Sequence, residues 1–480
     1  MAERGRLDLG AVAGIVCNEV GDATGLIEEM LRTMKHRGTR TGTASLEPTI
    51  PSDPQAAIGC ASHQNPEARI AASQERAVAV DGSFFETRES TQARFVRDQF
   101  KRRSVTSTVA TLLGRAGGYS CLILGGKGAL AFRDMNGLKP LYVSHYQGTV
   151  AFASERKALW KIGLKETERV HPGQLYSTAH RKLTRVPVGS PPRLPREMPL
   201  TLSSASSRLS TLLAKSIRRA TRNVDKVAVA FSGGLDSAVT AKLAKIAGRN
   251  VELISVGLPG SSELSTADRC AKDLDLRFTL ETFAPDMLEE YVQRVVWLIE
   301  EPNLMKVSIA VPLHWAAMVA AKRGYKVMLC GQGSDELYGG YYKYARTLDE
   351  KGPKALRAEL YRSVLQASEV NYERDDQATA PSGVELRTPF ADREVIKFSL
   401  GIPTELKVKP GNDLTRKWVL RDVAKRLGLP EETVWKRKKA IQHGTGVENA
   451  IRKIAKSRNL TTDEYLFRVH RDVVRLESMP

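Results

Sequence analysis

The stretch that decides the fold is VAVAFSGGLDS, residues 227–237. Its first five residues are apolar and few enough to form a buried strand, and the turn after them leads directly into residues with helical apolar spacing. Two adjacent glycines, Gly233 and Gly234, let the backbone come close to an anion, and the free N–H groups of the turn and helix start point toward it. The hydroxyls of Ser232 and Ser237 add two donors. The segment predicts a pyrophosphate-binding loop at the end of a strand.

The elements around this loop predict a parallel sheet. A helix is expected over 203–222, before the first strand, and another over 237–247, after the loop. A second strand over 251–256 then completes a right-handed strand–helix–strand unit. Farther along, a helix over 310–322 precedes a strand over 326–330, and the remainder of the chain has mostly helical patterns.

A second loop, GQGSDE at 331–336, again follows an apolar strand. The carboxyl ends of parallel strands meet at one edge of the sheet, where ligands collect. Asp236 of the first loop and Asp335 of the second are therefore expected to share a magnesium ion, which takes oxygen ligands.

The first loop is neither a Walker A loop, which needs a lysine before its last hydroxyl residue, nor a dinucleotide fingerprint. It resembles the PP-loop of the ATP pyrophosphatases, S-G-G-x-D-S. Further motifs follow in an order similar to the synthetase domain of the asparagine synthetase family: VGLPG at 256–260, EEPN at 300–303, GVELRTPFAD at 383–392 and a lysine at 438. This resemblance covers most of residues 226–446.

The resemblance implies an ATP- and magnesium-dependent ligase. A carboxylate, with aspartate as the first candidate, would attack the α-phosphorus of ATP, and a nitrogen nucleophile would then displace AMP. ATP would be bound by Ser232, Gly233, Gly234, Asp236, Ser237, Val256 and Gly331, and magnesium by Asp236 and Asp335.

Two residues are assigned to catalysis on this resemblance. Many family members have a glutamate where this chain has Gln332, so Glu300 is the candidate base for the attacking amine, with Glu385 in reserve. Lys438 is expected to stabilise negative charge in the transition state, and Lys439 is a competing assignment.

Residues 11–186 resemble the Ntn-type glutaminase domain that precedes this synthetase domain, through motifs at 13–15, 34–38, 133–141 and 152–159. The family's nucleophilic cysteine, which starts the mature chain, corresponds here to the internal Ala13, and its N-G-E motif corresponds to Asp81-Gly82-Ser83. Cys17 has no free α-amine to activate it. We therefore expect no glutaminase activity, with free ammonia, or a separate glutaminase, as the nitrogen source.

These features give an expected architecture: an α+β Ntn-like sandwich over 1–186, a proline-rich linker over 187–202, and an α/β PP-loop domain over 203–480. The five cysteines are scattered and odd in number, which predicts free thiols. No secretory signal or membrane-spanning run is apparent, so a cytoplasmic location with no membrane partner is expected.

Charge leaves some alternatives open. The 480 residues include 73 Lys and Arg against 54 Asp and Glu, a net charge of +19. This excess fits ATP, a tRNA, or an ordinary solvated basic surface. The alternatives to an ammonia-dependent ligase are a cyclase similar to the β-lactam synthetases, in which an internal amine attacks, and a PP-loop enzyme that modifies tRNA. The sequence shows no RNA-binding module that would favour the second.

Overall fold

The protein was analysed as a computed structural model, which describes residues 10–17, 22–46, 55–87, 91–101, 103–126, 128–179, 182–437 and 444–477. The chain forms two compact units. The first runs up to Pro191 and also contains Thr379–Glu385 and the segment from His470, whereas the second contains Pro192–Ala378 and Leu386–Val469. The domain division expected from the sequence, with its linker at 187–202, stays a prediction.

The first unit contains two six-stranded sheets, in the orders β10-β8-β9-β1-β3-β2 and β12-β11-β7-β6-β5-β4. Neighbouring strands pair antiparallel wherever their register is described. The strands are β1 (Gly10–Cys17), β2 (Arg40–Leu46), β3 (Gln55–Ser62), β4 (Ile70–Ala72), β5 (Arg76–Phe84), β6 (Gly117–Gly125), β7 (Gly128–Arg133), β8 (Tyr142–Tyr146), β9 (Thr149–Ala153), β10 (Glu168–Arg169), β11 (Gln174–Ser177) and β12 (Thr184–Pro187).

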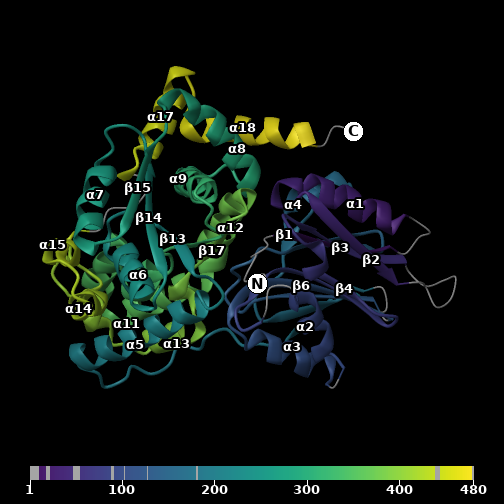
Figure 1. Ribbon diagram of the computed structural model, residues 1–480, viewed down its shortest axis with the longest axis horizontal. Coiled ribbons are helices and arrows are strands. Elements are labelled where there is room, and N and C mark those ends of the chain that lie inside the picture. Colours follow the sequence, from purple (N-terminus) through teal and green to yellow (C-terminus); the bar gives the residue numbers. More distant parts are fainter. Residues whose placement is uncertain are drawn as a thin grey trace. The chain divides into compact units, whose positions relative to one another are not determined.

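Side-chain alternation along the strands builds three apolar layers in this unit. On β1, Val12 and Val16 face the second sheet, while Ala13 and Ile15 face the helices α1 (Ala23–Thr33) and α4 (Arg156–Lys161). The helices α2 (Gln92–Gln99) and α3 (Val105–Leu113) cover the outer face of the second sheet. Figure 1 shows the resulting helix–sheet–sheet–helix order. The predicted Ntn-like sandwich is confirmed.

The second unit is built on a sheet in the order β15-β14-β13-β16-β17. Its strands are β13 (Lys226–Ala230), β14 (Asn250–Gly257), β15 (Arg277–Thr282), β16 (Val327–Leu329) and β17 (Glu385–Arg387). β13 pairs parallel with both β14 and β16, and β14 pairs parallel with β15. The predicted α/β fold is therefore confirmed.

Helices pack on both faces of this sheet: α6 (Leu235–Ile246), α7 (Ser262–Leu274) and α9 (Leu304–Lys322) contact its strands. The other described helices from residue 202 onward are α5 (Leu202–Ala220), α8 (Leu288–Ile299), α10 (Ser334–Tyr338), α11 (Tyr342–Ala367), α12 (Glu373–Thr379), α13 (Arg393–Leu400), α14 (Trp418–Arg426), α15 (Glu431–Trp435), α17 (Val447–Ser457) and α18 (Thr462–Glu477), of which α18 belongs to the first unit from His470 onward. Figure 1 shows α7 and α9 on opposite sides of β13 and β14, as right-handed crossovers require. The predicted strand–helix–strand unit is β13, α6 and β14.

Helix α9 is longer than the sequence predicted. It begins at Leu304 because the side chain of Asn303 accepts a hydrogen bond from the backbone of Lys306 (3.0 Å), and it continues through Pro312. Among the described helices it alone is long and apolar enough to cross a membrane, but 67% of its most apolar window is buried inside the structure. The core helix of a globular protein has the same properties.

Sheet topology places the two predicted loops side by side. From β13 the chain moves outward to β14 and β15 and then returns to the other side of β13 with β16. The reversal creates a crevice at the carboxyl ends of β13 and β16, the usual ligand position in open α/β sheets.

One lysine of the second unit is buried with little compensation for its charge. Lys407 is 2% exposed, and the charge of Glu197 raises its pKa whereas the charge of Arg357 lowers it. Glu197 already accepts a hydrogen bond from the backbone of Thr404 (3.1 Å). Burial therefore dominates and lowers the pKa of Lys407 to about 7.

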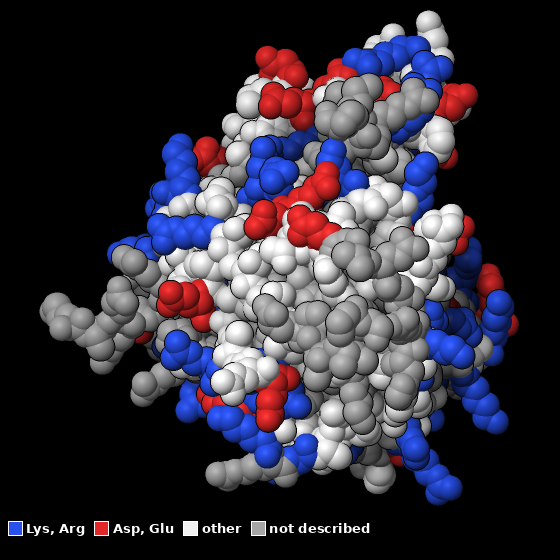
Figure 2. Space-filling view, turned by 90° about the vertical axis from the view of Figure 1, so that its right-hand side faces the viewer, with Lys and Arg blue, Asp and Glu red and all other residues white. Residues whose placement is uncertain are grey.

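On the face shown in Figure 2, Lys and Arg lie in several separate groups, with Asp and Glu among them, and the described residues between these groups are mostly uncharged. This pattern is typical of a solvated surface and adds no support to the tRNA alternative.

Candidate active site

The predicted pyrophosphate loop has the geometry that its sequence indicates. Gly233 has φ +62°, and a side chain there would place Cβ 2.8 Å from the Cα of Ala267, so both the conformation and the space require glycine. The loop is braced by its own hydroxyls, because Ser237 Oγ donates to the carbonyl of Gly234 (3.1 Å) and the N–H of Gly234 donates to Ser232 Oγ (3.3 Å).

The two predicted metal-binding aspartates converge on one ammonium group. Lys417 Nζ lies 2.6 Å from Oδ1 of Asp236 and 2.6 Å from Oδ1 of Asp335, and it donates to Ser334 Oγ at 2.7 Å. The lysine is 3% exposed. A Cβ at Gly340 would lie 1.8 Å from Asp335 Oδ1, so glycine at that position makes the contact possible. The sequence analysis did not find Lys417, because no motif marks it.

A magnesium ion fits these residues. The carboxylates of Asp236 and Asp335 already contact one cation, the ammonium group of Lys417. Magnesium in nucleotide sites is commonly held by one or two carboxylates together with substrate phosphates. Among the described residues there is no group of three or more His, Cys, Asp or Glu that would hold a metal without a substrate. Asp236 and Asp335 would therefore bind magnesium together with a nucleotide.

A basic cavity of about 220 Å³ lies on one side of the loop. Among the described residues that line it, five carry positive charge: Arg416, Lys417, Arg421, Lys436 and Arg437. Lys436 Nζ donates to the carbonyl of Gly233 at 3.0 Å, and burial lowers the pKa of Arg416 and Arg421. Desolvated cations around a helix N-terminus form a site for phosphate groups. We call this cavity the basic chamber.

A larger cavity of about 540 Å³ lies on the other side and shares Ser232 and Asp236 with the basic chamber. Val256, Gly331 and Asp335, all predicted site residues, line it. Its described lining carries four carboxylates, from Asp236, Asp335, Glu336 and Asp375, and one cation, Lys343. We call it the acidic chamber.

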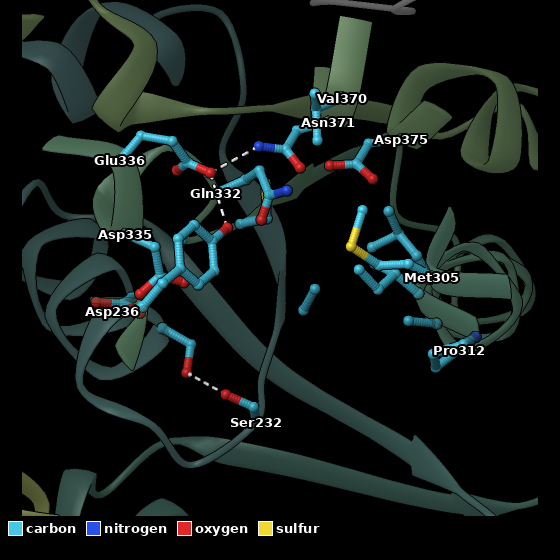
Figure 3. Close-up of a pocket in the computed structure, with 18 of the residues that line it drawn as sticks. Ser232, Asp236, Met305, Pro312, Gln332, Asp335, Glu336, Val370, Asn371 and Asp375 are labelled. Carbon is cyan, nitrogen blue, oxygen red and sulfur yellow. Dashed lines mark hydrogen bonds between the residues drawn. The ribbon is translucent and has the colours of Figure 1, made fainter. Parts of the chain in front are cut away.

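Polar groups gather at one end of the acidic chamber. Oε1 of Glu336 accepts hydrogen bonds from the hydroxyl of Tyr341 (2.7 Å) and from Nδ2 of Asn371 (2.8 Å). Figure 3 shows Glu336 and Asn371 close to Gln332, with Met305 and Pro312 on a different wall. Burial and then the charge of Asp335 raise the pKa of Glu336.

The residues assigned to catalysis lie outside these cavities or outside the described structure. Glu300 ends α8 with φ +59°, is 4% exposed and accepts a hydrogen bond from Nε2 of Gln377 (3.4 Å), but it is not among the described lining residues. Glu385 belongs to the first compact unit and accepts a hydrogen bond from Ser83 Oγ (3.4 Å). Lys438 and Lys439 lie outside the described residues. All these roles stay predictions.

In the first unit, Ala13 is fully buried on β1 beneath α1, with no nucleophile at its position. Arg37 instead forms ion pairs with Asp81 (3.2 Å) and with Glu155 (3.3 Å), and Lys157 also contacts Glu155 (2.6 Å). Despite burial, His36, Lys157 and Arg37 together hold the pKa of Glu155 low. The opposite charges of these buried groups therefore offset one another.

Comparison with known proteins identifies the family of the chain. Residues 208–354 and 344–471 match the family model described as Asparagine synthase. A protein of Methanocaldococcus jannaschii named "putative asparagine synthetase (glutamine-hydrolyzing) 1" is 34% identical over 389 residues, covering 71% of this chain and 72% of that protein. Asparagine synthetase 2 of Arabidopsis thaliana, also named glutamine-hydrolyzing, is 27% identical over 335 residues, covering 67% of this chain and 57% of the plant enzyme.

Among solved structures, the glutamine phosphoribosylpyrophosphate amidotransferase of B. subtilis, complexed with ADP and GMP, aligns with a TM-score of 0.34 and 17% identity. The alignment covers 56% of this chain and 65% of that one. A TM-score of 0.34 is too low to support a conclusion about function. The match to the family model and the similarity to the archaeal protein show that the chain belongs to the asparagine synthase family.

Proposed function

We propose that the protein is an ATP-dependent amide ligase that adenylates a carboxylate and then amidates it, releasing AMP and pyrophosphate. The observation that carries this proposal is the pair of chambers of opposite charge that share Ser232 and Asp236. The β- and γ-phosphates would lie in the basic chamber. The nucleoside, the α-phosphate and the carboxylate would lie in the acidic chamber.

In the first step, an oxygen of the carboxylate attacks the α-phosphorus, and the bond to the leaving pyrophosphate breaks. The five cations of the basic chamber stabilise the charge of the leaving group, and Lys417 holds Asp236 and Asp335 in place. Magnesium bound by these aspartates would neutralise phosphate charge. In the second step, the nitrogen adds to the acyl carbon and AMP leaves.

Aspartate is our first candidate for the carboxylate and free ammonia for the nitrogen donor. The test is a screen for pyrophosphate release with ATP, magnesium, ammonium chloride and a panel of carboxylic acids. Amide product accompanied by equal amounts of AMP and pyrophosphate would support the proposal. An amine-bearing acid that cyclises without ammonium would favour the β-lactam-synthetase-like alternative. Failure of every acid would refute the proposal.

We expect glutamine to be an ineffective nitrogen donor, although the similar proteins above are named for glutamine hydrolysis. Ala13 offers no thiol, and burial raises the pKa of Cys17, which keeps that thiol protonated. Purified protein should release no glutamate from glutamine, while ammonium chloride at raised pH should support amide formation. Glutamate release that disappears in a Cys17→Ser variant would contradict this expectation.

We also retain Glu300 as the candidate base for the second step, with Lys438 as the residue that stabilises charge. Glu300→Gln should preserve ATP–pyrophosphate exchange but lose amide product, because only the second step needs a proton acceptor. Glu301→Gln is the matched control, since Glu301 contacts Lys306 (2.5 Å) in the same segment. If exchange is lost together with amide product, Glu300 serves binding or the first step instead.

A further inference from the structure

One wall of the acidic chamber is apolar and is built by a single face of helix α9. Met305, Ile309 and Leu313 recur every four residues, so their side chains lie above one another on the helix, and all three line the cavity. Pro312 and Ala316 lie on the same face and also line it. At a rise of about 1.5 Å per residue, this face is roughly 12 Å long from the first to the last of the three. We call these five residues the α9 wall.

Part of this apolar surface is accessible rather than packed into the core. Met305 is 47% exposed, and Val370, which lines the cavity from a turn of π-helix at Ser368–Tyr372, is 37% exposed. Figure 3 shows Met305 and Pro312 across the cavity from Asp335. Accessible apolar side chains in a cavity are the surface that ligands bury. A ligand that extends from the strand-end loops to α9 would therefore present an apolar part to the α9 wall.

The charges of the chamber disfavour a ligand with a second carboxylate. The described lining carries four carboxylates and one cation, Lys343, whose Nζ already lies 3.6 Å from Oε1 of Glu359. Lys417 contacts Asp236 and Asp335 and is not among the described residues that line this cavity. Magnesium at the two aspartates would attract the reacting carboxylate. A second carboxylate would lose its water beside negative charges, with no described lining cation left to pair with it.

We infer that the acid substrate is a monocarboxylic acid whose apolar body, an alkyl chain or an aromatic ring, packs against the α9 wall. This inference rests on the proposed function and names the substrate class of the same site. Family resemblance makes aspartate the first candidate, whereas the lining of the chamber ranks an apolar monocarboxylic acid above it. The predicted nucleotide-binding residues Val256 and Gly331 lie at strand ends, not on α9.

The test is ATP–pyrophosphate exchange with acids that differ in one property at a time. Hexanoate and acetate differ only in chain length, and hexanoate and adipate differ only in a terminal carboxylate. We expect kcat/KM for hexanoate to exceed that for acetate on the order of 100-fold, because each of the four added methylenes contributes roughly fourfold when buried. It should exceed that for adipate at least about tenfold. Equal use of hexanoate and acetate, or of hexanoate and adipate, would overturn the inference.

Met305→Gln tests whether the α9 wall makes this selection. Glutamine keeps the length of the side chain but replaces the thioether with an amide, and the exposed position tolerates it. The ratio of kcat/KM for hexanoate to that for acetate should fall about fivefold or more. Met318→Gln is the matched control, because Met318 lies on α9, is half-buried and is not among the described lining residues.

Two results of this experiment would contradict the inference. One is an unchanged ratio in Met305→Gln. The other is an equal rise in KM for ATP with every acid, which would show that the α9 wall binds the nucleoside instead. In Met318→Gln the ratio should be that of the wild type.

Failure of the proposed function is a separate outcome. If the wild-type protein uses aspartate but not hexanoate, the ligase proposal stands and the inference is wrong. If no acid supports exchange, the ligase proposal fails, and calorimetric titration of hexanoate and adipate into the wild-type and Met305→Gln proteins tests the inference directly. A preference for hexanoate that weakens in the variant would support it, and equal or absent binding of the two acids would overturn it.

Discussion

Asp236→Asn should reduce pyrophosphate release at least about 100-fold, a loss of roughly 3 kcal/mol of transition-state stabilisation. The substitution removes a negative charge from the point where the two chambers meet and where magnesium would bind. Folding should be retained, because asparagine has nearly the same shape and Lys417 keeps its contacts with Asp335 and Ser334. Initial rates of pyrophosphate release with ATP, magnesium and the best acid measure the effect.

Asp268→Asn is the matched control for this experiment. Asp268 lies on α7, where it forms an exposed ion pair with Lys272 at 2.7 Å, and it lines neither chamber. Pairs of this kind contribute little, so the control should keep normal activity and stability. A normal rate in Asp236→Asn would refute the assignment of 232–237 as the pyrophosphate loop.

Lys407→Met should stabilise the second unit by several kcal/mol at pH 6. The pKa of Lys407 is about 7 in the folded protein and near 10.5 in the unfolded chain. Between these values the unfolded chain binds more protons, so the wild type loses stability as the pH falls from about 10.5 to about 7. The full penalty, on the order of 5 kcal/mol as an upper limit, is present below pH 7. Methionine removes the charge and keeps most of the volume.

Urea unfolding followed by tryptophan fluorescence measures this effect, since four of the five tryptophans lie in the second unit. The difference between variant and wild type should shrink as the pH is raised toward 10. Lys397→Met, at an exposed position on α13, is the control and should leave the pH dependence unchanged. A variant that is no more stable than the wild type at pH 6 would show that water or Glu197 already solvates the ammonium.

The fold and the pyrophosphate loop could be predicted because their signals are local. A run of five apolar residues, two glycines and a helical pattern are adjacent in the chain, and the physical demands of a strand, a tight turn and a helix start act over that distance. The second loop, residues 331–336, could be predicted for the same reason, because it directly follows an apolar strand. The positions of Asp236 and Asp335 at neighbouring strand ends then follow from the rules for parallel sheets.

The rest of the site depends on contacts between distant parts of the chain. Lys417 is 181 residues away from Asp236, and its charge does not distinguish it from the other basic residues. The hydrogen bonds that Glu336 accepts from Tyr341 and Asn371 likewise become apparent only in the folded chain. For Glu300, the sequence supplied a motif position but no information on whether its side chain reaches a cavity, and the described lining of neither chamber includes it.

The segment that carries Lys417 illustrates a conflict between folding and chemistry. Arg416 and Lys417 are consecutive residues with φ of +50° and +56°, a conformation that costs roughly 1–2 kcal/mol for each residue with a side chain. Glycine would relieve that strain but would remove two of the five cations of the basic chamber. Selection for stability alone would therefore replace these residues, and their strained backbone persists only because the surrounding structure holds it in place.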